Sequence, residues 1–217
     1  MPKTRAIIIP VTPFQQNCTL LWSESSGRGA VVDPGGDLAR IHQAIARAGC
    51  TVERILLTHG HIDHAGGAAE LREALGVPIE GPHPADNFLL ERLAETGRGY
   101  GIAGARDVVP DRILAEGDRV TVGDLDFAVL HCPGHSPGHV AFVRAEERYA
   151  LTGDVLFRGS VGRTDLPGGD QRTLLRTIRD KLLPLGDGMA FLPGHGPGGT
   201  IGQERATNPF LARLGEA

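Results

Sequence analysis

The feature that most constrains this chain is a set of apolar, strand-like segments that each end in a glycine turn carrying histidine or aspartate. The densest example follows the segment Glu53–Leu57 and reads Thr-His-Gly-His-Ile-Asp-His over residues 58–64. Residues two apart in an extended segment point to the same side, so His59 and His61 can share one metal ion. Imidazoles and carboxylates packed this closely would be costly to bury without a cation. We therefore expect a metal site here.

Further turns of the same kind complete a ligand set. His135, Asp154 and His195 each follow an apolar segment and come directly after a glycine. With the first cluster, the chain offers five histidines and two aspartates, whereas one metal ion takes three or four protein ligands and keeps a position open for water. Seven ligands suit two ions that share a carboxylate. The predicted ligands of the first ion are His59, His61 and His135. Those of the second ion are Asp63, His64 and His195, and Asp154 is predicted to bridge the two.

The apolar pattern predicts strands and helices in an order that favours two sheets packed together with helices outside, an α/β fold. Strands are expected at Arg5–Ile9, Cys18–Trp22, Gly29–Asp33, Glu53–Leu57, Arg119–Val122, Leu125–His131, Val140–Arg144, Arg148–Leu151 and Met189–Leu192. Helices are expected at Gly66–Leu75, Pro84–Thr96 and Gln203–Leu211. Two more are expected to begin after Asp37 and after Asp170, whose side chains can cap a helix. No linker divides the chain, so we expect one domain over residues 1–217.

Composition excludes several classes of function. The 217 residues carry a net charge of −4, which argues against nucleic-acid binding. No apolar run approaches the ~18 residues of a membrane helix, and the apolar stretch near the start is too short for a secretory signal. The three cysteines are unclustered, so a disulfide framework is not expected, and Cys132 is expected to be a small buried side chain. We expect a cytoplasmic protein.

The motif His-x-His-x-Asp-His, with Gly-His at 134–135, Gly-Asp at 153–154 and Gly-His at 194–195, resembles the metallo-β-lactamase superfamily. That resemblance covers nearly the whole chain and implies a four-layered αββα sandwich with a dinuclear metal site at one edge of the two sheets. Residues 153–159, 162–165, 192–197 and 204–209 are similar to the short, single-domain hydroxyacylglutathione hydrolases of bacteria, a branch of the glyoxalase II group.

The resemblance implies a metal-dependent thioester hydrolase acting on small molecules such as S-lactoylglutathione. We expect two divalent ions per chain, zinc first, with iron or manganese as alternatives, because imidazole and carboxylate accept all three. Zinc lowers the pKa of bound water from 15.7 to about 7. Asp63 is expected to bind one ion and to orient the attacking water. Arg163 takes the place of a substrate-binding lysine and is expected to bind a substrate carboxylate; the alternative is an ion pair with Asp165.

Several alternatives remain open. A persulfide dioxygenase of the same superfamily would use a single iron held by His59, His135 and Asp154. Lactonases, β-lactamases and RNA-processing nucleases share the motifs, and a non-catalytic metal-binding module could keep the fold. Of the remaining polar residues, His139 is expected to be structural, and Asp33 to fix a turn or support a histidine that binds metal.

Overall fold

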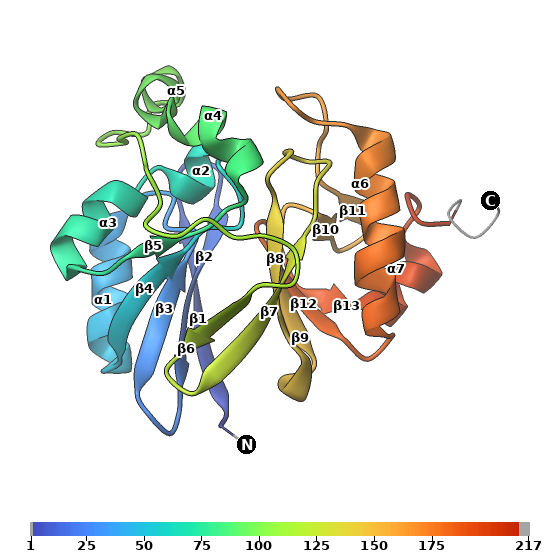
Figure 1. The fold of residues 1–217 in the computed structure, drawn as a ribbon, viewed down its shortest axis with the longest axis horizontal. Coiled ribbons are helices and arrows are strands. Elements are labelled where there is room, and N and C mark those ends of the chain that lie inside the picture. Colours follow the sequence, from blue (N-terminus) through green and yellow to red (C-terminus); the bar gives the residue numbers. More distant parts are fainter. Residues whose placement is uncertain (1, 213–217) are drawn as a thin grey trace.

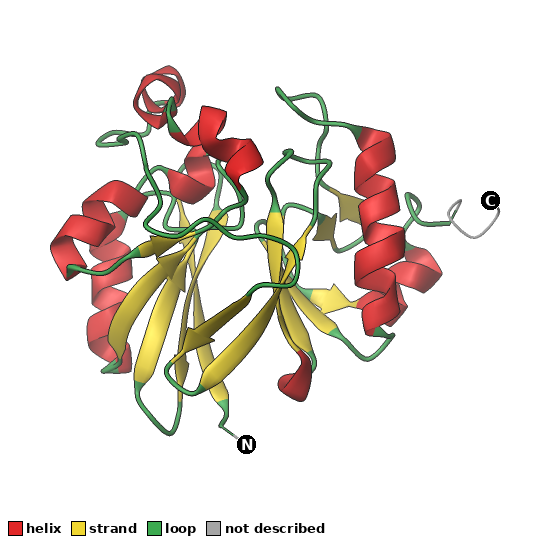
Figure 2. Ribbon diagram, viewed as in Figure 1, coloured by secondary structure: helices red, strands yellow, loops and turns green. Residues whose placement is uncertain are grey.

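The structure is a computed structural model that describes residues 2–212. Two β-sheets face each other in the middle of the molecule, and helices cover the outer side of each (Figure 1, Figure 2). The first sheet has the order β1-β2-β3-β4-β5, with bounds Thr4–Val11, Gln16–Ser23, Arg28–Val32, Thr51–Leu56 and Ile79–Glu80. The second has the order β13-β12-β9-β8-β7-β6. The bounds of its strands are Arg119–Val122 (β6), Leu125–His131 (β7), Val140–Arg144 (β8), Tyr149–Gly153 (β9), Ala190–Pro193 (β12) and Gly199–Thr200 (β13). A short hairpin joins Leu156–Phe157 (β10) to Ser160–Val161 (β11).

Four layers follow from the way the strands alternate their side chains. Successive residues of a strand point to opposite faces. Ile55 of β4 packs under the first helical layer, whereas Leu56 packs between the sheets. Phe142 and Val143 of β8 divide in the same way, toward the space between the sheets and toward the second helical layer. The expected αββα sandwich is therefore confirmed.

The helices are short and lie on both sides of the sandwich (Figure 1). Beside the first sheet lie α1, α2, α3, η1, α4 and α5, with bounds Leu38–Ala48, Ile62–Ala65, Ala68–Leu75, Pro84–Asp86, Asn87–Leu90 and Leu93–Tyr100. Later in the chain come η2, α6, η3, η4 and α7, with bounds Ala145–Glu147, Gln171–Thr177, Ile178–Leu182, Leu183–Leu185 and Ile201–Thr207. As predicted, the side chain of Asp170 caps α6 by accepting a hydrogen bond from Thr173 N (2.6 Å). None of the described helices is long and apolar enough to cross a membrane.

Strand direction brings the candidate residues to one rim. β8 runs antiparallel to both β7 and β9, and β9 runs parallel to β12, so β7, β9 and β12 share one direction. Their carboxyl ends therefore reach the same edge of the second sheet. Val140 N at the start of β8 donates a hydrogen bond to Thr58 O (2.7 Å), which joins this edge to the loop after β4.

Two predicted helices are wrong in extent. Residues 84–96 do not form one helix: Arg92 leaves the helical region (φ −129°, ψ 15°) between α4 and α5. The apolar periodicity of residues 84–96 predicts Phe88 on the inner face of one helix; with that helix broken, Phe88 is instead 40 % exposed. The last helix ends at Thr207 rather than Leu211, because Asn208 precedes a proline and adopts an extended conformation (ψ 118°).

Candidate metal centre

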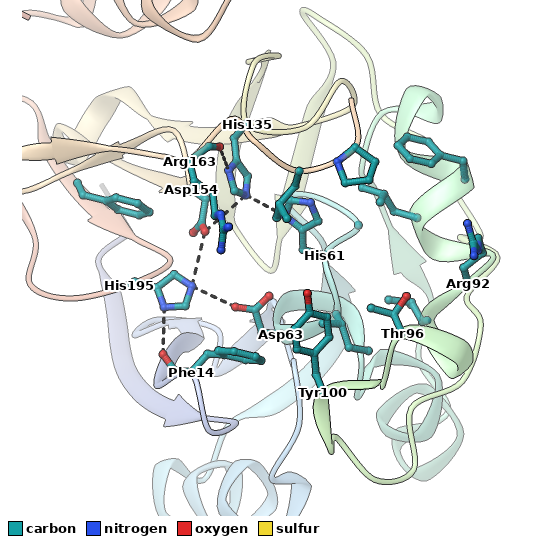
Figure 3. Close-up of a pocket in the computed structure, with 18 residues that line it drawn as sticks. Phe14, His61, Asp63, Arg92, Thr96, Tyr100, His135, Asp154, Arg163 and His195 are labelled. Carbon is teal, nitrogen blue, oxygen red and sulfur yellow. Dashed lines mark hydrogen bonds and ion pairs between the residues drawn. The ribbon is translucent and has the colours of Figure 1, made fainter. Parts of the chain in front are cut away.

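The loop after β4 presents the first group of ligand-type atoms. His59 and His61 lie on this loop, and His135 lies on the turn after β7. One ring nitrogen of each of these three residues lies within 4.8 Å of the others. His61 Nδ1 is 2.9 Å from His135 Nε2, a contact that joins the two loops across the rim (Figure 3).

A second group lies beside the first. It consists of Asp63 and His64, in the first turn of α2, and His195, which follows β12; their candidate ligand atoms also lie within 4.8 Å of one another. Asp63 Oδ2 is 3.1 Å from His195 Nε2 and 3.9 Å from His64 Nε2. The structure thus brings together both triads that the sequence predicted.

Asp154 lies between the two triads. It follows β9, and its backbone turn uses Gly153 at φ +47°, a conformation that glycine adopts without strain. Asp154 Oδ2 is 3.6 Å from His135 Nε2 and 3.5 Å from His195 Nε2, whereas Oδ1 is 3.3 Å from His64 Nε2. One carboxylate therefore reaches both groups, which is the geometry expected of a bridge.

Unpartnered polar atoms show that the cluster fits metal ions. Among the described residues, four buried atoms of this cluster have no hydrogen-bond partner: His59 Nε2, His61 Nε2, His64 Nε2 and Asp154 Oδ1. Buried polar atoms without partners are rare and need an explanation. Imidazole nitrogens and carboxylate oxygens are the donor set that zinc and iron accept, so a cation would satisfy these atoms.

Gly194 leaves the room that this cluster needs. A Cβ at this position would lie 2.1 Å from Asp154 Oδ1 and 2.5 Å from His64 Cε1. Both contacts are far inside the van der Waals distance, and the first would fall on an atom that has no partner. The sequence Gly194-His195 therefore places a ligand-type side chain next to a position that has no side chain.

The protonation behaviour of the first triad also suits a metal. Burial, together with the neighbouring histidines, lowers the pKa of His59 well below its usual value. The same causes, burial first, lower the pKa of His61 to about 3. These rings are therefore neutral at physiological pH and keep a lone pair, as metal coordination requires.

The second triad lies in a negative field. Burial alone would lower the pKa of His64, but Asp154, Asp63 and Asp33 raise it well above its usual value. Burial would raise the pKa of Asp154, but His64 and the other nearby histidines lower it far below its usual value. Three carboxylates around one imidazole favour a positive charge among them, which a divalent cation would supply.

Comparisons with known proteins identify the family. A sequence model of the Metallo-beta-lactamase superfamily matches residues 11–195, most of the chain. The chain belongs to the metallo-β-lactamase superfamily. Hydroxyacylglutathione hydrolase GloC from Haemophilus influenzae is 46 % identical over 205 residues, which are 94 % of this chain and 96 % of that protein.

Two solved structures are similar to this chain over almost its full length. BLEG-1 B3 metallo-beta-lactamase has a TM-score of 0.87 and 38 % identity, and the match covers 95 % of this chain and 99 % of that one. TTHA1623 in a di-iron-bound form has a TM-score of 0.86 and 41 % identity, with 94 % and 100 % covered. Together with the His/Asp clusters, the superfamily fold implies a divalent metal site in this chain.

Other residues of this metallo-β-lactamase fold orient the candidate ligands. Asp33 Oδ2 accepts a hydrogen bond from His64 Nδ1 (2.9 Å), which leaves His64 Nε2 to face Asp154. Asp33 also accepts hydrogen bonds from Thr58 N (2.7 Å) and Thr58 Oγ1 (2.6 Å). Asp33 therefore both fixes the loop and supports a histidine, the two roles that the sequence left open for it.

Two further contacts fix ring orientation. His135 Nδ1 donates a hydrogen bond to Arg163 O (2.7 Å), so His135 Nε2 faces the cluster. His139 is fully buried, stacks on His59 with ring centroids 4.7 Å apart, and accepts a hydrogen bond from Asp154 N (3.0 Å) through Nε2. His139 is thus a buried residue that holds the Asp154 backbone.

Asp86 is a buried residue that sequence reasoning missed. Its carboxylate accepts hydrogen bonds from Gly60 N (2.9 Å), Ser136 Oγ (2.7 Å) and Gly138 N (2.5 Å). Gly60 lies between His59 and His61, and Ser136 follows His135. Asp86 therefore ties together the two loops that carry the first triad. No motif marks it, because its partners come from distant parts of the chain.

Arg163 lies on the rim of a pocket that opens onto both triads (Figure 3). Its side chain is exposed and forms a bidentate ion pair with Asp165, with both N–O distances 2.7 Å. That pair is the alternative that the sequence raised for Arg163. Exposed ion pairs contribute little to stability, so the guanidinium can exchange this partner for another carboxylate.

Proposed function

We propose that this chain is a metal-dependent thioester hydrolase of the hydroxyacylglutathione hydrolase type. The observation that carries the proposal is the convergence of two triads on Asp154, with unpartnered buried atoms, beside one pocket. The identity of 46 % with Hydroxyacylglutathione hydrolase GloC supports the thioester chemistry. The proposed substrate is a small glutathione-derived thioester such as S-lactoylglutathione.

In this proposal the chain holds two divalent cations. His59, His61 and His135 would hold one, Asp63, His64 and His195 would hold the other, and Asp154 lies where it could contact both. Zinc is the proposed metal; TTHA1623 was solved in a di-iron-bound form, so iron remains an alternative to be measured. When bound, two divalent ions supply a lowered water pKa and an electrophilic partner for a carbonyl oxygen.

The residues of the chain position the reactants. Asp63 Oδ2 is 3.1 Å from His195 Nε2 at the pocket wall, where the carboxylate would accept a hydrogen bond from the attacking water and orient it. Arg163 would pair with a carboxylate of the thiol part of the substrate. The leaving thiolate has a pKa near 8.5, so a strong general acid is not needed.

The test combines metal analysis with hydrolysis. We expect about two metal ions per chain, loss of S-lactoylglutathione hydrolysis after treatment with a chelator, and its return when metal is added. His64→Asn should remove most activity and one ion, whereas His42→Asn, an exposed position on α1, should change neither. One iron per chain, with oxygen uptake on glutathione persulfide and no hydrolysis, would favour the dioxygenase instead.

A second variant tests substrate contact. Arg163→Ala should raise KM for S-lactoylglutathione several-fold and leave the metal content unchanged, because its side chain lies outside both triads. Arg158→Ala, an exposed arginine in the same part of the chain, is the control and should leave KM unchanged. An unchanged KM for Arg163→Ala would remove this residue from the binding site.

A further inference from the structure

The pocket extends well beyond the two triads. Its volume is about 600 Å³, and it reaches from His195 to Arg92 and Thr96 at its far end (Figure 3). Pockets of this size hold small organic molecules. Away from the triads its walls are mainly apolar and include Phe14, Phe88, Leu89, Leu93, Tyr100 and Leu166.

Aromatic side chains on these walls are left in contact with solvent. Among the exposed large hydrophobic residues of the described chain, Phe14 (43 %), Phe88 (40 %) and Tyr100 (54 %) all line this pocket. Phe14 and Tyr100 meet edge to face with ring centroids 5.6 Å apart. Apolar surface that gathers in a concave site, rather than scattering over the molecule, marks a binding surface.

One part of the pocket is defined by Phe88, Leu89, Leu93 and Leu166, which we call the apolar arm. The arm is bounded by α4, α5 and the loop before α6. That loop packs against α4, since a Cβ on Gly168 would lie 3.4 Å from Phe88 Cζ.

The cations of the pocket are already paired. Arg92 contacts Glu95 through Nε (3.0 Å) and Nη2 (2.9 Å), and Arg163 holds Asp165. Without substrate, each arginine thus faces a carboxylate, and the arm itself offers apolar contact because its four residues are uncharged. A small hydroxylated acyl group would leave the arm in contact with water.

We propose that the apolar arm receives the acyl group, so that the preferred substrates are thioesters with an apolar acyl group of about the size of phenylacetyl. This inference rests on the proposed function, which assigns Arg163 to the thiol part and leaves the arm for the acyl part. Burying a benzyl group in place of a methyl group gives a preference of about tenfold or more.

Binding and turnover test the inference separately. Two thioethers that cannot be hydrolysed, S-(2-phenylethyl)glutathione and S-ethylglutathione, are titrated into the metal-loaded protein by calorimetry. The phenylethyl compound should bind about tenfold more tightly or better. Phenylacetyl, lactoyl and acetyl thioesters of glutathione are then compared, and kcat/KM should be highest for phenylacetyl by a similar factor.

Variants locate the effect. Phe88→Ala and Leu166→Ala should each lower the phenylethyl-to-ethyl affinity ratio several-fold, whereas Val109→Ala, an exposed apolar position outside the pocket, should keep it. Equal affinities for the two thioethers, or a ratio that survives Phe88→Ala, would overturn the inference. If Phe88→Ala changes the molar mass of the protein in solution but keeps the phenylethyl-to-ethyl affinity ratio, the apolar arm is an interface between copies of the chain. That result would also overturn the inference. Selective thioether binding without hydrolysis of any thioester would contradict the proposed function and support the arm.

Discussion

Replacing Asp86 by asparagine should weaken metal binding at the first triad and leave the second triad unchanged. The carboxylate of Asp86 is fully buried and accepts three hydrogen bonds, two of them from backbone N–H groups. Asparagine keeps one acceptor oxygen and replaces the other by an NH2 group, which cannot accept from Gly138 N. The variant would therefore lose the hydrogen bond to the loop that carries His135 at Gly138, and the two loops of the first triad would be held together less firmly.

The magnitude follows from two opposing effects. A hydrogen bond to a charged acceptor contributes about 1.5–3 kcal/mol to stability, and its loss leaves a buried donor unpaired. Burial raises the pKa of Asp86, so the ionised carboxylate carries a desolvation cost that the neutral amide avoids. We therefore expect the free energy of unfolding to fall by only about 1–2 kcal/mol. Residues that orient ligands typically change metal affinity by about 10–100-fold, and we expect this range for the first ion.

The assay separates the two effects. Urea unfolding of metal-free protein gives the stability change, and competition with a coloured chelator gives the affinity of each ion. Glu204→Gln is the matched control, since Glu204 is also buried and accepts hydrogen bonds from Gly159 N (2.7 Å) and Asn208 Nδ2 (2.8 Å). The control should lose stability and keep both affinities. If Asp86→Asn binds both ions as tightly as the unmodified chain, Asp86 does not hold the first triad in place.

Further substitutions probe the second triad. Asp33→Asn should lower the affinity for the second ion about 10–100-fold, because Asp33 accepts the hydrogen bond that orients His64; metal titration checks this, and equal affinity would contradict it. Gly194→Ala should reduce the metal content to one ion or fewer, since its Cβ would fall 2.1 Å from Asp154 Oδ1; two tightly bound ions in this variant would show that the backbone moves freely.

The site was predictable from the sequence because each ligand-type residue follows a strand. Parallel strands place their carboxyl ends at one edge, and this is why His135, Asp154 and His195 could be grouped without a structure. His59 and His61 were placed on one side of the loop for a different reason, because residues two apart in an extended segment point the same way. The hairpins of the second sheet were also predictable, because alternating apolar residues and short turns are local signals.

Residues that act through distant partners were not predictable. Asp86 belongs to a segment that reads as a plain helix, and its three donors come from loops 26 to 52 positions away. The break at Arg92 has a similar origin, since apolar periodicity continues through it and only the fold separates α4 from α5. His83 stacks on His131 with ring centroids 4.1 Å apart, a contact between two distant segments of the chain. Contacts of this kind depend on the packed tertiary structure and leave no periodic pattern in the chain.

The proposed hydrolysis depends on two cations bound side by side at the rim of the sandwich. The most direct measurement is a crystal structure of metal-loaded protein with anomalous scattering recorded at the absorption edge of the metal found by elemental analysis. We expect two anomalous peaks, one bonded to His59, His61 and His135 and one to Asp63, His64 and His195, with Asp154 reaching both. A single peak in fully loaded protein, with His64 and His195 beyond bonding distance of it, would show that the second triad binds no ion.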